Sequence, residues 1–130
     1  MDSPFSLSGK NIIITGASSG IGRQCAIDLV RNETKVFLTA RRENLLKEVL
    51  LGTGNNCTYC ATEITNFEII EKSLNDFVAL NGKLDGLVFS TGIEYLLPLK
   101  SMAIEKYIEM FNINTFAALE LVRICTKKKY

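Results

Sequence analysis

Two serines and three glycines follow a run of isoleucines near the N-terminus, in the stretch IIITGASSGIG. Gly16, Gly20 and Gly22 give the backbone freedom to turn sharply after a strand and to approach a bound group closely. A helix opened by such a loop presents unpaired N–H groups and the positive end of its dipole. The stretch therefore predicts a binding loop for a dinucleotide pyrophosphate, and no Gly-Lys-Ser or Gly-Lys-Thr follows it, which excludes a P-loop.

The four cysteines are the other candidates for chemistry, and Cys57 and Cys60 form a C-x-x-C pair. Zinc needs about four ligands, whereas the chain has no histidine and no second close cysteine pair. The absence of histidine also excludes a Ser-His nucleophile. The sequence NCTYCAT is typical of a strand, where residues three apart point to opposite faces. We therefore interpret both cysteines as apolar strand residues in a reducing compartment, and we expect no metal site.

The bulk properties indicate one ordinary globular domain spanning residues 1–130. The net charge of +1 gives no support for nucleic-acid or membrane-surface binding. No apolar run approaches the roughly 20 residues that span a bilayer, and the N-terminus lacks the pattern of a signal peptide. A cytoplasmic location is therefore expected. The basic C-terminal stretch TKKKY is interpreted as a solvated helix end, with a recognition patch as the alternative.

Hydrophobic periodicity changes repeatedly between the strand and the helix pattern along the chain. The capping-box pair Thr65 and Glu68 and the stop at Gly82 delimit one of the helices. Strands are predicted over 11–15, 35–40, 57–61 and 84–90, and helices over 20–31, 41–52, 65–82 and 103–127. This alternation predicts an α/β fold, a doubly wound parallel sheet with helices on both faces.

The stretch TGASSGIG, Thr15 to Gly22, resembles the T-G-x-x-x-G-x-G cofactor motif of the short-chain dehydrogenase/reductase family. The resemblance extends from LSGKNIIITGASSGIG to the last helix. It implies a Rossmann-like sheet of four strands in the order 3-2-1-4, stopped before the later strands of the family. It also implies hydride transfer between a nicotinamide cofactor and a small carbonyl or alcohol substrate, and assembly as a homo-oligomer.

The end of the second predicted strand is expected to select the cofactor. Ala40 stands where NAD-preferring members carry an acid, and Arg41 and Arg42 follow it. A guanidinium binds a phosphate bidentately, and Ser18 can add a hydroxyl contact, so NADP is the expected cofactor. The alternative is that the arginines merely begin a solvated helix.

The resemblance extends to two further stretches near the cofactor. Glu63 and Ile64 match the Asp-Val step beside the adenine, with Glu in place of Asp. FSTGI, residues 89–93, falls where the family has N-N-A-G-I and retains only Gly92 and Ile93 of it, with a simple turn glycine as the alternative. The residues expected at the cofactor are Gly16, Ser18, Ser19, Gly20, Ile21, Gly22, Arg41, Arg42, Glu63, Ile64, Ser90, Thr91 and Gly92.

Asn114 matches the helix asparagine of the family, which resembles a proton-relay residue in role; the alternative is a satisfied core asparagine. The acid/base tyrosine of the family has a lysine four residues later, and none of the four tyrosines here does. In the family, that motif and its serine lie beyond residue 130. We expect the cofactor-binding half of an NADP(H)-dependent oxidoreductase, inactive on its own. The alternative is a non-catalytic nucleotide- or partner-binding module, and flavin or ATP binding is favoured less.

Overall fold

Four parallel strands form one sheet in the order β3-β2-β1-β4, which confirms the predicted topology. The computed structural model describes residues 3–130. Ile13 of β1 lies between Phe37 of β2 and Leu87 of β4. The strands are β1 (Asn11–Thr15), β2 (Lys35–Ala40), β3 (Cys57–Ala61) and β4 (Gly86–Val88).

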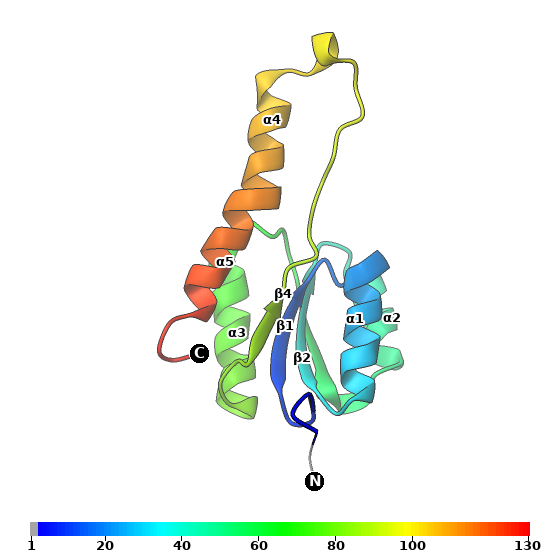
Figure 1. The fold of residues 1–130 in the computed structure, drawn as a ribbon, viewed down its shortest axis with the longest axis vertical. Helices are drawn as coiled ribbons and strands as arrows, with labels where there is room; N and C mark the ends of the chain where they lie inside the picture. Colours follow the sequence, from blue (N-terminus) through cyan, green and yellow to red (C-terminus); the bar gives the residue numbers. More distant parts are fainter. Residues whose placement is uncertain (1–2) are drawn as a thin grey trace.

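Helices cover both faces of the sheet, with α1 and α2 on one side and α3 and α5 on the other (Figure 1). The helices are α1 (Gly20–Arg31), α2 (Glu43–Leu51), α3 (Phe67–Asn81), α4 (Ile104–Phe111) and α5 (Ala117–Cys125). Short 3₁₀ turns occur at Gly54–Asn56 and Leu99–Ser101. None of the helices within residues 3–130 has the length and apolar character needed to cross a membrane.

Alternate residues of each central strand pack into two separate cores. Ile13 and Phe37 face α3 and α5, whereas Ile14 and Leu38 face α1 and α2. This two-sided burial explains the unbroken isoleucine run of β1, because each face must be apolar.

The two cysteines of the C-x-x-C pair fall into different cores, as predicted. Cys57 packs on the α1–α2 side and Cys60 on the α3–α5 side. Burial raises the pKa of the Cys57 thiol to about 11, so this group stays protonated at neutral pH. Within the described residues, no group of three or more His, Cys, Asp and Glu side chains could hold a metal.

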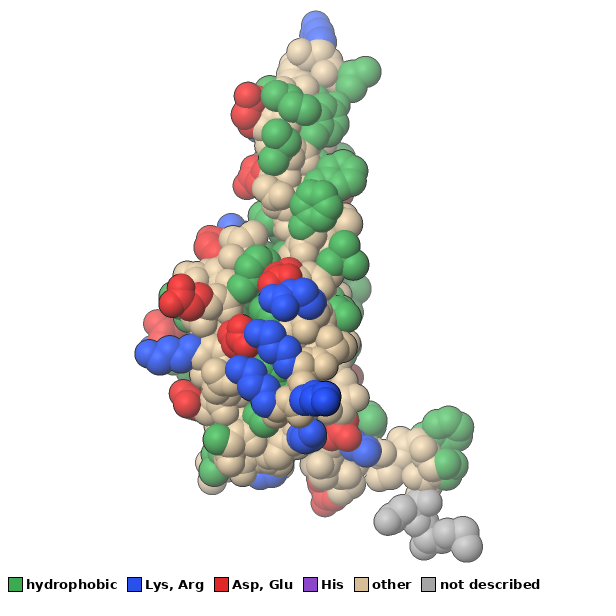
Figure 2. Space-filling model, turned by 90° about the vertical axis from the view of Figure 1, so that its left-hand side faces the viewer, with side chains coloured by type: hydrophobic (Ala, Val, Ile, Leu, Met, Phe, Trp, Pro, Cys, Tyr) green, Lys and Arg blue, Asp and Glu red, His purple; other side chains and the backbone are tan. Residues whose placement is uncertain are grey.

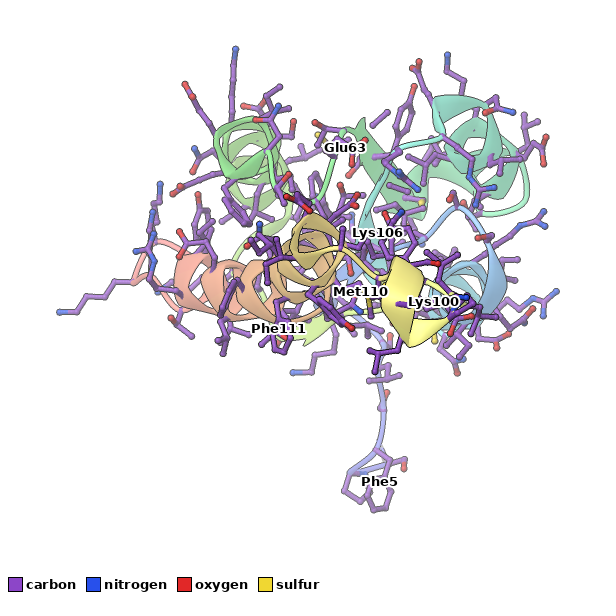
Figure 3. The ribbon with its side chains drawn as sticks, turned by 90° about the horizontal axis from the view of Figure 1, so that it is seen from above. Phe5, Glu63, Lys100, Lys106, Met110 and Phe111 are labelled. Atoms are coloured by element: carbon purple, nitrogen blue, oxygen red, sulfur yellow. The ribbon has the colours of Figure 1, made fainter. Side chains whose placement is uncertain are left out.

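The predicted helix over 103–127 is interrupted. α4 ends at Phe111, a π-helical segment runs from Asn112 to Phe116, and α5 follows. α4 and the loop before it project beyond the sheet (Figure 1). Hydrophobic side chains gather on this projecting part, whereas Lys and Arg side chains gather lower on the same face (Figure 2). Phe111 points outwards from α4, and Phe5 lies away from the body of the molecule (Figure 3).

Two local expectations are wrong at α3 and β4. The residue that precedes α3 is Asn66 rather than Thr65, and no side chain caps the helix, so the capping box does not form. β4 is limited to Gly86–Val88 instead of 84–90.

The C-terminal stretch folds back onto α3, so the interpretation as a solvated helix end is wrong for Tyr130, whereas Thr126, Lys128 and Lys129 are exposed. Tyr130 is only 5% exposed, and its hydroxyl donates a hydrogen bond to Asn75 Oδ1 at 2.7 Å. Its carbonyl oxygen accepts from the Leu84 N–H at 3.1 Å. Nearby, the Lys127 ammonium lies 2.6 Å from the Glu71 carboxylate. The stretch thus joins α5 to α3 and to the loop before β4.

Candidate functional site

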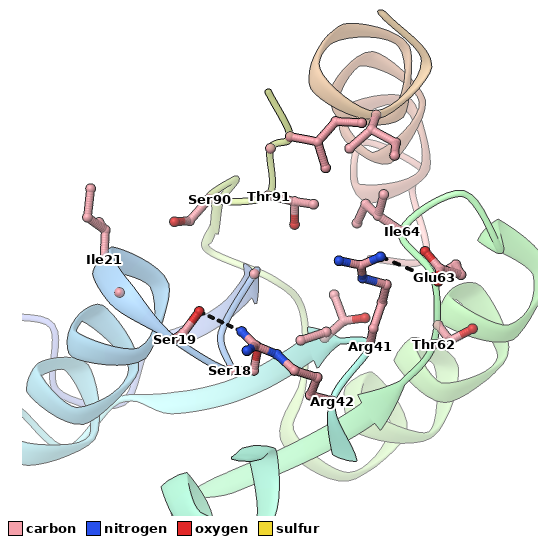
Figure 4. A pocket seen from close by; sticks show the side chains of 17 residues that line it. Ser18, Ser19, Ile21, Arg41, Arg42, Thr62, Glu63, Ile64, Ser90 and Thr91 are labelled. Carbon is pink, nitrogen blue, oxygen red and sulfur yellow. Dashed lines mark hydrogen bonds and ion pairs between the residues drawn. The ribbon is translucent and has the colours of Figure 1, made fainter. Parts of the chain in front are cut away.

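A cavity of about 440 Å³ lies where the carboxyl ends of the four strands meet. Its walls come from the segments that leave β1, β2, β3 and β4 (Figure 4). Open parallel sheets bind ligands at this edge. Of the residues expected at a cofactor, the wall contains Gly16, Ser18, Ser19, Gly20, Ile21, Arg41, Arg42, Glu63, Ile64, Ser90, Thr91 and Gly92.

The glycines of the loop have different structural roles. Gly16 has a φ of +63°, and a Cβ added to it would collide with the Ser90 carbonyl oxygen. A Cβ added to Gly22 would lie 2.5 Å from the Gly16 carbonyl oxygen, so Gly22 packs behind the loop and does not line the cavity. Gly20 has a φ of +55°, and the position of its missing Cβ faces open space, with no described atom within 4 Å apart from those of its chain neighbours and its own helix backbone. The backbone of the loop is therefore held close to β4 and left open at Gly20.

The N-terminus of α1 faces the cavity, and neither a capping side chain nor an acidic side chain of its first turn occupies its N–H groups. Ser19 occupies the N-cap position, but its side chain does not cap the helix. The first turn carries no acidic side chain. Ser19, Gly20 and Ile21 all line the cavity. The positive end of the helix dipole and the free N–H groups suit an anionic ligand such as a pyrophosphate.

The two arginines after β2 point in different directions (Figure 4). Arg42 Nη2 donates to Ser19 Oγ at 2.8 Å and to Ser18 Oγ at 3.3 Å. Arg41 Nη1 lies 3.9 Å from Glu63 Oε1 on the other side of the cavity. The Arg42 side chain thus returns to the glycine loop, although its backbone leads directly into α2.

The segment after β4 is fixed at two points. The Ser90 N–H donates to Thr15 Oγ1 at 3.0 Å. Asn114 donates from Nδ2 to the Ile93 carbonyl oxygen and accepts at Oδ1 from the Ile93 N–H, each at 2.8 Å. Asn114 is exposed and does not line the cavity, so the alternative of a core asparagine is wrong. Its hydrogen-bond partners are backbone groups, which gives it a positioning role in this structure.

Further residues line the cavity that sequence reasoning missed, among them Thr39, Thr62, Ile93 and Ile113. Thr39 and Thr62 lie at the ends of β2 and β3, so a strand-end rule could have found them. Thr39 is 1% exposed, and its hydroxyl has no hydrogen-bond partner within the described residues. Ile113 lies in the π-helical segment, and no sequence signal pointed to it.

Three of the tyrosines have hydroxyls that donate to carboxylates, and Tyr130, which donates to Glu71 at 3.2 Å, lies far from the cavity in the C-terminal stretch. Tyr95, near the cavity, donates to Glu109, and this bond raises the pKa of Tyr95. Tyr59 donates to Glu43 at 2.8 Å, which raises the pKa of Tyr59. A tyrosine that acts as a base at neutral pH needs the opposite shift. The donors and positive charge around the open glycine loop suit the binding of an anionic ligand.

Comparisons with known proteins find that the chain is similar to several oxidoreductases. The family model described as short chain dehydrogenase matches residues 10–129. A hydroxynaphthalene reductase of Aspergillus fumigatus is 30% identical over 121 residues, which cover 90% of this chain and 44% of the relative. A benzil reductase of Saccharomyces cerevisiae is 32% identical over 127 residues, covering 90% and 48%.

Solved structures agree with the sequence matches. The crystal structure of a Saccharomyces cerevisiae short-chain dehydrogenase/reductase superposes with a TM-score of 0.80 at 29% identity, covering 88% of this chain and 47% of that one. A Bacillus anthracis short-chain dehydrogenase, at 22% identity and a TM-score of 0.79, shows the same fold over 89% of this chain and 49% of its own. The chain spans about half the length of the relatives it matches.

Proposed function

Because this chain belongs to the short-chain dehydrogenase/reductase family, we propose that residues 1–130 form the cofactor-binding half of an NADP(H)-dependent oxidoreductase. When bound, the nicotinamide supplies or accepts the hydride that interconverts a carbonyl and an alcohol. The residues of this chain bind the rest of the cofactor: the glycine loop and α1 take the pyrophosphate, and Glu63 and Ile64 flank the adenine.

One observation supports NADP(H) over NAD(H). At the end of β2, where a carboxylate would hold the ribose hydroxyls of NAD, the chain has Ala40. The guanidinium of Arg42 follows it, hydrogen-bonded to Ser18 and Ser19. Positive charge together with hydroxyl groups favours a ligand with a 2′-phosphate, and a neutral ribose gains less from it.

The substrate of the whole protein is proposed only as a class. Two relatives are named as reductases of hydroxynaphthalene compounds and of benzil, both of which are aromatic. Because both relatives are named as reductases, a small carbonyl compound is the proposed substrate. Assembly as a homo-oligomer is part of the same proposal, and the cytoplasmic location stays a prediction.

Calorimetric titration of the 130-residue chain with NADP⁺ and NAD⁺ tests the cofactor proposal. A charge-assisted contact contributes about 1.5–3 kcal/mol, so the dissociation constants should differ by more than about tenfold. The variant that combines Arg41→Gln with Arg42→Gln should bind both cofactors with similar affinity. Equal affinities of the unmodified chain for NADP⁺ and NAD⁺ would remove the proposal.

A non-catalytic nucleotide-binding module is the second candidate, and the tyrosines favour it for these 130 residues. No tyrosine has a lysine four residues later, and Tyr59 and Tyr95 are hydrogen-bonded to carboxylates. The purified chain should therefore not oxidise NADPH with ketones, acyl thioesters or quinones. Turnover that disappears on Tyr95→Phe would show a catalytic site assembled within these residues.

A further inference from the structure

A site of chemical modification lies at the end of the sheet opposite the cavity. Of the asparagines in the sequence, Asn81 alone precedes a glycine, and this pair joins the end of α3 to the turn before β4 (Figure 1). We propose that Asn81 deamidates through attack by the Gly82 nitrogen, and that the side chain of Asn11 controls the rate by holding the last turn of α3 closed. The reaction needs only water, so it is independent of the proposed cofactor and substrate.

The chemistry joins two neighbouring groups of the main chain and side chain. After the Gly82 amide nitrogen has lost its proton to solvent, it attacks Asn81 Cγ, a C–N bond forms, and the side-chain nitrogen leaves as ammonia. Water then opens the resulting succinimide ring at either carbonyl carbon. The product has aspartate or isoaspartate at position 81, and nothing is oxidised or reduced. Glycine favours the attack because no side chain shields its nitrogen.

In the folded chain, both reacting groups are held by α3. The Gly82 N–H donates to the Val78 carbonyl oxygen at 2.8 Å, and Asn81 Nδ2 donates to the Phe77 carbonyl oxygen at 2.9 Å. Asn81 is the last residue of the helix, so its ψ angle must leave the helical range before Cγ can meet the Gly82 nitrogen. Deamidation therefore requires the last turn of α3 to open.

Asn11 holds this turn against the start of β1. Its Nδ2 atom donates to the carbonyl oxygens of Asn81 and Lys83, at 3.0 and 2.9 Å. Asn11 is only 5% exposed, and its Oδ1 atom has no hydrogen-bond partner within the described residues. An unpaired buried oxygen is unfavourable, and the amide keeps this orientation because both of its N–H groups are satisfied. Since rotation about ψ of Asn81 moves its carbonyl oxygen, the bond from Asn11 must break when the turn opens.

Either product of the reaction weakens the closed turn. An aspartate carboxylate cannot donate to the Phe77 carbonyl oxygen, and it lies at the negative end of the α3 dipole. Isoaspartate adds a methylene group to the main chain, which displaces the carbonyl oxygen that Asn11 binds. The modification thus loosens the contact between α3 and β1 irreversibly.

Peptide mapping by mass spectrometry measures the reaction at Asn81 and at an internal control. Asn32 follows α1, and its Nδ2 donates to the Asp28 carbonyl oxygen at 2.8 Å, but the next residue is Glu33. In urea, Asn81 should deamidate faster than Asn32. In buffer, Asn81 should react at least about tenfold more slowly than in urea, because opening breaks several hydrogen bonds. Equal rates at Asn81 and Asn32 in urea, or at Asn81 in buffer and in urea, would overturn the proposal.

Asn11→Ala tests the control of the rate, with Thr53→Ala as the matched variant. The Thr53 hydroxyl lies within hydrogen-bond distance of the Val49 and Leu50 carbonyl oxygens, so both substitutions remove side-chain contacts with carbonyl oxygens near the end of a helix. Asn11→Ala should speed the reaction at Asn81 in buffer by about tenfold, whereas Thr53→Ala should change it by less than about twofold. Equal acceleration would show that global unfolding sets the rate, which would overturn the role of Asn11.

Hydrogen exchange of the unmodified chain gives a second measurement that does not depend on the folding of any variant. Exchange of the Gly82 N–H and deamidation both need this group to be released from the Val78 carbonyl oxygen. The slowing of deamidation in buffer relative to urea should therefore be at least as large as the protection of the Gly82 N–H from exchange. A protected Gly82 N–H together with unslowed deamidation at Asn81 would overturn the proposal.

Discussion

The side-chain amide of Asn114 forms hydrogen bonds with both backbone polar groups of Ile93, so the π-helical segment between α4 and α5 is tied to the chain leaving β4. Ser90, Thr91 and Gly92, which line the cavity, lie between that tie and the end of β4. The amide therefore helps to set the shape of one cavity wall without lining it.

Asn114→Ala should lower the free energy of unfolding by about 0.5–1.5 kcal/mol per hydrogen bond lost. Asn114→Asp should cost at least as much, because a carboxylate accepts from the Ile93 N–H but repels the Ile93 carbonyl oxygen. Urea unfolding measures both. Asn112→Ala is the matched control, since Asn112 lies in the same segment and its side chain forms no hydrogen bond with any of residues 3–130. If Asn112→Ala and Asn114→Ala lowered the free energy of unfolding equally, the stabilising role of the hydrogen bonds between Asn114 and Ile93 would be contradicted.

Alanine at the two loop glycines with positive φ should have unequal effects. Gly16 and Gly20 have φ values of +63° and +55°, so either substitution costs about 1–2 kcal/mol of backbone strain. At Gly16 the new Cβ also collides with Ser90, whereas at Gly20 it meets open space. Gly16→Ala should therefore lower the thermal unfolding midpoint more than Gly20→Ala does. The reverse order would contradict the packing described for the loop.

Stability should fall as the pH falls through the acid range, because of Glu71. Hydrogen bonds from Lys127 and then Lys129 lower the pKa of Glu71 from 4.5 to about 2. A group with a lowered pKa stabilises the folded state fully above its unfolded pKa and loses that contribution on protonation. The loss should thus appear between about pH 4.5 and pH 2, measured by urea unfolding at several pH values.

The control for this pH effect is a carboxylate on the same helix. Glu71→Gln should reduce the slope of stability against pH in that window. Asp76→Asn should leave it unchanged, because Asp76 is exposed on α3 and forms no ion pair among the described residues. If Asp76→Asn reduced the slope as much as Glu71→Gln, the assignment to the C-terminal contact would be wrong.

The chain should self-associate through α4 and α5. These two helices carry large apolar side chains that are exposed, including Phe111 at 57% and Leu119 at 64%, and Figure 2 shows hydrophobic side chains gathered on the projecting part of the molecule. Contiguous apolar surface of this kind favours association. Analytical ultracentrifugation should show species larger than the monomer, and Phe111→Ser with Leu119→Ser should reduce them. A stable folded monomer of the unmodified chain would contradict the prediction.

Sequence patterns predicted the parts of this fold that depend on neighbouring residues. The isoleucine run, the glycine spacing and the alternation of periods are local, and they indicated β1, the loop and a parallel sheet with helices on both faces, whereas the strand order was implied by the family resemblance. The π-helical segment around Asn114 and the docking of Tyr130 onto α3 depend on contacts between distant segments. The same holds for Arg42, whose partners Ser18 and Ser19 precede it by more than twenty residues. No window of sequence contains these relationships.

The position of β1 between β2 and β4 has a consequence for synthesis on the ribosome. Ile13 can pair with Phe37 soon after β2 is synthesised, but its partner on the other side, Leu87, is synthesised much later. Elongation at about 5–20 residues per second leaves this edge of β1 unpaired for several seconds. The unpaired backbone N–H and C=O groups of such an apolar edge can pair with strands of other chains. The nascent chain is thus most exposed to mispairing with neighbouring nascent chains before β4 emerges, and slower translation across residues 38–86 would lengthen that period.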